Sequence, residues 1–326
     1  MRCASVDIGT NTLRLLIADV EGDRLKPIHR GRVITRLGGG YKEDLGINPL
    51  SAERTIDAVT LFARILKEYG VNDVKAVATS VMRRAKNRET FIDEVFKRTG
   101  LKVDVITGDE EARLSLLGVL SVIKAGTDFK SVPAFIIDIG GGSTEFIAVD
   151  EGKMLGAWSM EMGVVHLTEE YLKSDPPAKH ELNAMEDEIK GVIANLKDLM
   201  SQSLPSAFSL EPSALFVGTA GTVTTLAALD QALEVYEPER INNYILTYDA
   251  VKRMYWYLAS LPLKEREKIL TLEKGREDLI IPGAAIVLKV MEGFGFDRMT
   301  VSDAGLLEGI LLEQLQVASH KLQVKT

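Results

Sequence analysis

The feature that most restricts the fold of this chain is an internal repeat. The segment Asp7–Gly9 recurs as Asp138–Gly140, and at the same offset Thr12 corresponds to Ser143. Both copies have the pattern of a strand, a short polar turn, a second strand, a charged turn and a third strand. Two copies of one β-rich α/β unit predict two similar domains that face each other across a cleft.

Length and composition agree with a two-domain globular protein. The chain has 326 residues, of which 46% are hydrophobic and 26% charged, and its net charge is −8. An acidic chain is a poor non-specific ligand for nucleic acid, so no nucleic-acid partner is expected. No apolar run reaches the roughly 18 residues of a membrane span and the N-terminus lacks a signal-peptide core, so we expect a cytoplasmic protein without a membrane partner. The single cysteine, Cys3, is expected to be buried.

Helical periodicity follows each group of strands. Apolar residues recur at helical spacing in residues 51–70, with Ser51 expected as N-cap and Gly70 just after the C-terminal end. Further helices are expected over residues 88–100, 110–123, 166–172, 181–200 and 306–316. The alternation of strands and helices predicts an α/β fold class.

Three turns rich in glycine and hydroxyl residues have the composition of phosphate-binding loops. They are Asp7–Arg14, Asp138–Glu145 and Gly218–Thr222, and the third lies between an expected strand and an expected helix. Glycine allows a ligand close to the backbone, successive N–H groups form an anion nest, and a helix N-terminus favours phosphate. A plain hairpin is the alternative for any one of them, and neither a P-loop nor a G-x-G-x-x-G motif occurs. The candidate phosphate-binding residues in these turns are Gly9, Thr10, Asn11, Thr12, Arg14, Gly140, Gly141, Gly142, Ser143, Thr144, Gly218, Thr219, Ala220, Gly221 and Thr222.

Charged residues beside these turns suggest metal and phosphate ligands. A hairpin brings Asp138 and Glu145 together, and two carboxylates beside a phosphate suit Mg²⁺. The alternative for Glu145 is an ion pair with a surface cation. In the first repeat the matching position is Arg14, whose guanidinium suits phosphate oxygens.

Two further pairs of charged residues follow strands. Glu110 and Glu111 begin a helix, where only one can point to a ligand and where acidic residues also serve as dipole partners. Arg83 is a candidate phosphate ligand because strand ends in α/β domains commonly face the ligand, although Arg83 and Arg84 could equally be a solvated pair. The four histidines have no metal-ligand spacing.

These motifs together resemble the exopolyphosphatase/guanosine-pentaphosphate phosphatase (Ppx/GppA) family of the actin–hexokinase–Hsp70 superfamily. The resemblance runs from about Ala4 to Leu315 and is carried, in family order, by SVDIGTNTLRLLIA, VATSVMRRAKN, ITGDEEARLSLLGV, IIDIGGGSTEF, VGTAGTVTTLAAL and TVSDAGLLEGIL. It implies two ribonuclease-H-like (actin-like) domains, at residues 1–126 and 127–303, with the helix at 304–316 returning to the first.

The resemblance also implies a reaction, in which Mg²⁺ or Mn²⁺ assists hydrolysis of a terminal phosphoanhydride. The substrate is inorganic polyphosphate or guanosine pentaphosphate. Glu111 matches the catalytic acid of the family and Arg83 a phosphate-binding arginine, while Asp138 and Glu145, with Asp7 as a third candidate, hold the metal. A phosphotransferase of the same superfamily and a non-catalytic sensor are the alternatives, and a homodimer is left open.

Overall fold

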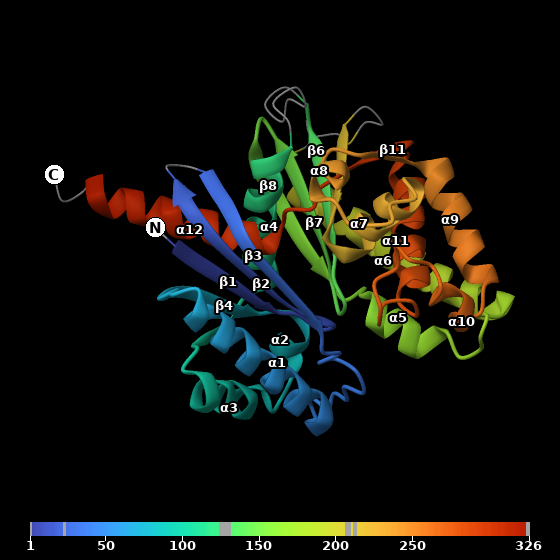
Figure 1. The fold of residues 1–326 in the computed structure, drawn as a ribbon. Helices are drawn as coiled ribbons and strands as arrows, with labels where there is room; N and C mark the ends of the chain where they lie inside the picture. The colour runs from blue at the N-terminus through green and yellow to red at the C-terminus, as the bar shows by residue number, and fades with distance from the viewer. Residues whose placement is uncertain (1, 22–23, 124–131, 206–209, 211–213, 324–326) are drawn as a thin grey trace. The chain divides into compact units, whose positions relative to one another are not determined.

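The structure is a computed structural model that describes residues 2–21, 24–123, 132–205, 210 and 214–323. It separates into two compact units, unit 1 (Met1–Ser121 and Gly305–Thr326) and unit 2 (Val122–Ala304). Of the two predicted boundaries, 126/127 lies outside the described residues, and the other is at 303/304. Each unit contains one mixed sheet with helices, which confirms the α/β class (Figure 1). Within the described residues, no helix is both long and apolar enough to cross a membrane.

The elements of unit 1 are β1 (Arg2–Ile8), β2 (Thr12–Glu21), β3 (Arg24–Ile34), α1 (Pro49–Glu68), β4 (Asp73–Ala78), α2 (Ser80–Arg84), α3 (Arg88–Thr99), β5 (Val103–Val105), α4 (Gly108–Val122) and α12 (Leu306–Gln323). Those of unit 2 are β6 (Ala134–Ile139), β7 (Thr144–Asp150), β8 (Lys153–Met160), α5 (Val164–Tyr171), α6 (Lys179–Ser203), β9 (Leu215–Thr219), α7 (Ala220–Asp230), α8 (Pro238–Ile241), β10 (Ile245–Thr247), α9 (Tyr248–Ser260), α10 (Leu263–Arg266), α11 (Ile280–Phe294) and β11 (Arg298–Val301).

Five strands of each sheet follow one topology, as the internal repeat predicts, and unit 2 adds β10 as an antiparallel edge strand. Unit 1 has the strand order β3-β2-β1-β4-β5, and unit 2 has β10-β11-β9-β6-β7-β8. In both, the first strand of the repeat pairs antiparallel with the second and parallel with a later strand. The register shifts after Ile17 between β2 and β3, and after Ala148 between β7 and β8. Because these residues share the offset of the repeat, even the local bulge is duplicated.

The sheet of unit 1 is covered on both faces. Alternate side chains of β2 point to opposite faces, so Leu15 packs with α1 while Leu16 packs with α12. Leu307 and Leu311 of α12 cover Leu16 and Cys3, and Figure 1 shows α12 in red alongside β1 and β2. Cys3 is buried, as predicted.

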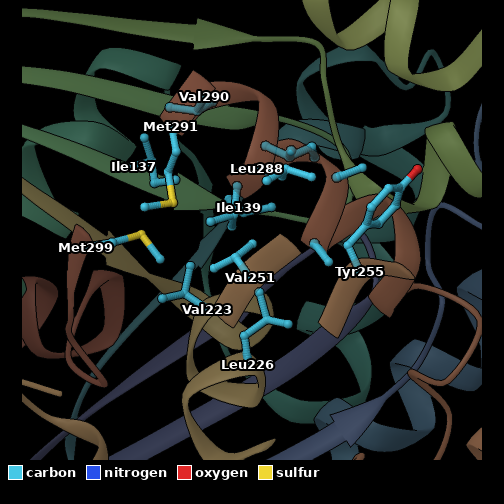
Figure 2. Close-up of a cluster of buried hydrophobic side chains, with 14 of the residues drawn as sticks. Ile137, Ile139, Val223, Leu226, Val251, Tyr255, Leu288, Val290, Met291 and Met299 are labelled. Carbon is cyan, nitrogen blue, oxygen red and sulfur yellow. The ribbon is translucent and has the colours of Figure 1, made fainter. Parts of the chain in front are cut away.

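The core of unit 2 lies between its sheet and a layer of helices. Figure 2 shows side chains of β6, α7, α9 and α11 packed together, with Tyr255 at one end of the cluster. The hydroxyl of Tyr255 donates a hydrogen bond to the Glu186 carboxylate (2.8 Å). Burial and this carboxylate both raise the pKa of Tyr255, so the phenol stays protonated and its one polar atom is satisfied.

For helix α1 the predicted N-cap residue is wrong, whereas the predicted C-terminal end is confirmed. Helix α1 begins at Pro49, and Asn48 rather than Ser51 caps it, because the Asn48 side chain accepts from the Leu50 N–H (2.9 Å). Proline at the first helical position fits there since it has no N–H to satisfy. Gly70 follows the helix with φ +65°, the left-handed conformation expected of that position.

The start of α6 contains a carboxylate that makes the stability of unit 2 depend on pH. Glu181 is 8% exposed and accepts hydrogen bonds from the Ser174 hydroxyl and from the N–H groups of Lys173, Ser174 and Ala178. These bonds, the Ser174 hydroxyl first, lower the pKa of Glu181 from 4.5 to about 2. Stability from a lowered carboxyl pKa is present above about pH 4.5 and is lost as the pH falls towards 2.

We therefore expect Glu181→Gln to cost about 1–2 kcal/mol in the free energy of unfolding at pH 7, and less at pH 3. Urea unfolding at both pH values measures this. Asp198→Asn, which changes an exposed carboxylate of the same helix, should leave the difference between the two pH values as in the unaltered protein. An equal cost for Glu181→Gln at pH 7 and pH 3 would contradict the prediction.

Candidate functional site

The turns of the two repeats close in the same way. The Gly9 N–H donates to the Thr12 carbonyl (3.1 Å), and the Gly140 N–H to the Ser143 carbonyl (2.9 Å). A Cβ atom on either glycine would lie 2.9 Å from that same carbonyl oxygen. Any side chain would therefore push the turn open, which explains glycine at both places.

The first turn is fixed by neighbours within unit 1. Its Thr10 carbonyl accepts from the Gly38 N–H (2.7 Å), and its Asn11 carbonyl from the Arg36 N–H (2.9 Å). The Thr10 hydroxyl accepts from the Val81 N–H of α2 (3.3 Å). The turn is therefore held between the loop that follows β3 and the start of α2.

Helix α2 brings Arg83 to Glu111. The Arg83 guanidinium donates to the Glu111 carboxylate at 2.5 Å, and the two side chains are 21% and 11% exposed. Glu111 lies in the first turn of α4, where its N–H bonds to the Thr107 carbonyl (2.9 Å), whereas the neighbouring Glu110 is more exposed. Glu111, the predicted catalytic acid, is thus more buried than Glu110. It is held by Arg83, the predicted phosphate ligand.

Asp7 and Arg14, which had been assigned to metal and phosphate, contact each other. They are paired across β1 and β2, and the Arg14 guanidinium approaches one Asp7 oxygen to 2.6 Å. The other oxygen, Oδ1, is buried and accepts no hydrogen bond from the described residues. A buried carboxylate oxygen without a donor is costly, and a cation or a water molecule would satisfy it.

In unit 2 three polar residues lie side by side at the ends of adjacent strands. Asp138 of β6 pairs in register with Glu145 of β7 on one side and with Thr219 of β9 on the other. All three are buried, with Asp138 6% and Glu145 1% exposed. The hydroxyls of Ser143 and Ser159 donate to one Glu145 oxygen at 2.7 and 2.8 Å, which orients the carboxylate.

The third turn leads from β9 into α7, as predicted. Ala220 has φ +69°, and the helix begins there. The hydroxyls of Thr219 and Thr144 donate to the carbonyls of Ala304 (3.0 Å) and Met162 (2.5 Å). Because each hydroxyl already donates its one hydrogen to a carbonyl, a phosphate contact from either threonine would come from its backbone N–H.

The structure adds an arginine that the sequence analysis missed. Arg276 lies against the third turn, since a Cβ atom on Gly221 would fall 1.5 Å from its guanidinium. An ion pair with Glu273 (3.1 Å) holds Arg276, which is 17% exposed. A cation at the first turn of α7 adds to the positive end of the helix dipole, a combination that favours a bound anion.

The predicted site residues thus form two groups. In unit 1 the Gly9–Thr12 turn, Arg83 and Glu111 are connected through α2. In unit 2 the Gly140–Thr144 turn, the two carboxylates and the Gly218–Thr222 turn are neighbours at the ends of β6, β7 and β9. Among the described residues no cluster of three or more His, Cys, Asp or Glu side chains could hold a metal by itself.

The sequence profile of the Ppx/GppA phosphatase family matches residues 16–318. Exopolyphosphatase 2 of Mycobacterium tuberculosis is 33% identical, and the alignment covers 95% of this chain and 98% of that protein.

Solved structures agree in fold. The crystal structure of the Aquifex aeolicus member of the Ppx/GppA family is 34% identical, with a TM-score of 0.79 and coverage of 98% of both chains. An exopolyphosphatase from Cytophaga hutchinsonii has a TM-score of 0.86 at 27% identity, covering 97% of this chain and 98% of that one. These matches confirm the predicted fold over nearly the whole chain.

Proposed function

The chain belongs to the Ppx/GppA phosphatase family, and from this premise we propose that it releases terminal orthophosphate from inorganic polyphosphate. The observation that carries the proposal is the ion pair between Arg83 and the buried Glu111, on the helix that contacts the Gly9–Thr12 turn. This arrangement supplies a carboxylate, a phosphate-binding guanidinium and a glycine turn within one unit. Phosphoryl transfer depends mainly on positioning and on neutralising charge, which these groups can provide.

In the proposed mechanism Glu111 orients a water molecule and takes its proton as the water attacks the terminal phosphorus atom. Arg83 moves part of its hydrogen bonding from Glu111 to the phosphoryl oxygens. The Gly9–Thr12 turn, which is held against α2 in the same unit, binds other oxygens of the anion. The P–O bond to the remaining chain breaks, and orthophosphate and a polyphosphate one unit shorter are the products.

We propose Mg²⁺ as cofactor, with Mn²⁺ as the alternative. The residues fit such an ion, because Mg²⁺ needs only one or two carboxylates when substrate phosphate and water complete its shell. Asp138 and Glu145 would hold it, since they are adjacent, buried and oriented by two serine hydroxyls. When bound, the ion would neutralise phosphoryl charge. Asp7, paired with Arg14, remains a further candidate ligand.

The first experiment measures orthophosphate release by the purified protein from polyphosphates of several lengths and from guanosine pentaphosphate. We expect release from polyphosphate that stops with a chelator and returns with added Mg²⁺. Asp138→Asn should raise the Mg²⁺ concentration needed for half-maximal rate. Release from guanosine pentaphosphate alone would reassign the substrate. Binding without release would indicate a sensor, and transfer to an added ADP acceptor a phosphotransferase.

A further inference from the structure

A second arginine of α2, Arg84, directly follows Arg83 and is held by an aromatic ring. The guanidinium of Arg84 lies over the ring of Tyr41, 5.3 Å from its centroid. The Tyr41 hydroxyl also donates to the main-chain carbonyl of Arg84 (3.3 Å). Tyr41 therefore contacts both the backbone and the side chain of this exposed arginine.

The Tyr41 loop is anchored to the same turn as Arg83. The Tyr41 N–H donates to the Gly38 carbonyl (3.1 Å), and the Gly38 N–H donates to the Thr10 carbonyl (2.7 Å). A Cβ atom on Gly38 would lie 2.3 Å from the Thr10 methyl group, so loop and turn are in close contact. Arg84 is thus tied to the Gly9–Thr12 turn through Tyr41, and Arg83 through α2.

We propose that Arg84, held by Tyr41, binds the phosphoryl group next to the one that is removed. The proposal rests on the proposed function, because it takes the Arg83–Glu111 pair as the place of the terminal phosphoryl group. Consecutive helical residues point about 100° apart, so Arg83 contacts Glu111 while Arg84 leaves α2 in a different direction. A polyanion with consecutive phosphoryl groups matches two adjacent guanidinium groups.

The stacked tyrosine suits this role physically. A guanidinium binds phosphate oxygens through two parallel N–H groups, and a ring face restrains it while leaving its charge intact. Restraint before binding lowers the entropic cost of ordering a long side chain. The subsite would also stabilise the negative charge that develops on the leaving phosphoryl group. Polyphosphate and guanosine pentaphosphate both carry such a group, so both are ligands of the proposed subsite.

The test measures binding by calorimetry in the Glu111→Gln protein, so that hydrolysis does not interfere. We expect Arg84→Gln to weaken binding of tripolyphosphate and of guanosine pentaphosphate by about 10- to 100-fold, the effect of losing a charged hydrogen bond. Binding of orthophosphate, which has no second phosphoryl group, should not change. Lys86→Gln removes the same charge from an exposed nearby position and should have little effect on any ligand.

Tyrosine variants separate the ring from the hydroxyl. Tyr41→Phe should stay near the parent affinity, whereas Tyr41→Leu should weaken tripolyphosphate binding several-fold. Equal loss for orthophosphate and tripolyphosphate in Arg84→Gln would overturn the subsite, as would a loss confined to guanosine pentaphosphate. The failure of the proposed function would look different. If the protein with Glu111 intact releases no phosphate, but tripolyphosphate binding still depends on Arg84, the proposed hydrolysis is wrong and the subsite is retained.

Discussion

Glu111→Gln is expected to reduce orthophosphate release from polyphosphate by about 10²- to 10⁴-fold, the usual cost of removing a general base. Glutamine keeps the size of the side chain and can still accept from Arg83, but it cannot take a proton from water. Glu111 is buried in the first turn of α4 and its carboxylate lies 2.5 Å from the Arg83 guanidinium. Initial rates at saturating polyphosphate measure the effect.

Glu110→Gln is the matched control for this experiment. It makes the same chemical change one residue earlier, at a partly exposed position on α4. We expect it to keep nearly the full rate, and both variants to retain the circular dichroism spectrum of the unaltered protein. The assignment of the base would be wrong if Glu111→Gln kept its turnover, or if Glu110→Gln lost as much.

The largest expected effect on stability comes from Gly118→Ala. A Cβ atom at Gly118 would lie 1.9 Å from the carbonyl oxygen of Gly305, at the start of α12. The contact is reciprocal, since a Cβ atom on Gly309 would lie 1.8 Å from the Leu114 carbonyl oxygen of α4. Helices α4 and α12 thus touch backbone to backbone, and neither backbone can move away as a flexible side chain would. We expect a cost of about 3 kcal/mol in the free energy of unfolding.

Gly191→Ala provides the contrast. Gly191 lies in α6, and a Cβ atom there would meet nothing within 4 Å. Alanine is favoured over glycine in a helix, so this variant should be as stable as the unaltered protein or up to about 1 kcal/mol more stable. Calorimetric melting of both variants tests the pair. Equal melting temperatures for Gly118→Ala and Gly191→Ala would show that the α4–α12 contact tolerates a methyl group.

The parts of the fold that sequence predicts well are those with local signals. The repeat of Asp7–Gly9 at Asp138–Gly140 predicts two sheets of similar topology, because the same residues form the turn between two strands in each copy. Gly70 and Gly100 mark helix ends because the residue that ends a helix often adopts the left-handed conformation, which glycine takes without strain. The start of α1 was misplaced because Asn48 and Ser51 are both good N-cap residues and only the path of the chain decides between them.

The residues that sequence could not place depend on distant contacts. Arg276 approaches Gly221 from a segment 55 positions later, and no periodicity or motif links the two. Tyr41 likewise contacts Arg84 only because its loop is anchored to the Gly9–Thr12 turn. The Asp7–Arg14 pair could have been anticipated, since a tight hairpin places these two residues opposite each other.

Unit 1 is built from both ends of the described chain, whereas unit 2 is continuous. During synthesis, β1 and β2 leave the ribosome long before the segment that covers them. Until α12 emerges, Leu16 and Cys3 lack Leu307 and Leu311, and the buried Ser5 hydroxyl lacks the Leu307 carbonyl (2.9 Å). Domains of a growing chain fold as units when their residues are complete. Unit 2 is therefore the first that a nascent chain can complete, and the N-terminal sheet is the part that keeps one face uncovered for longest.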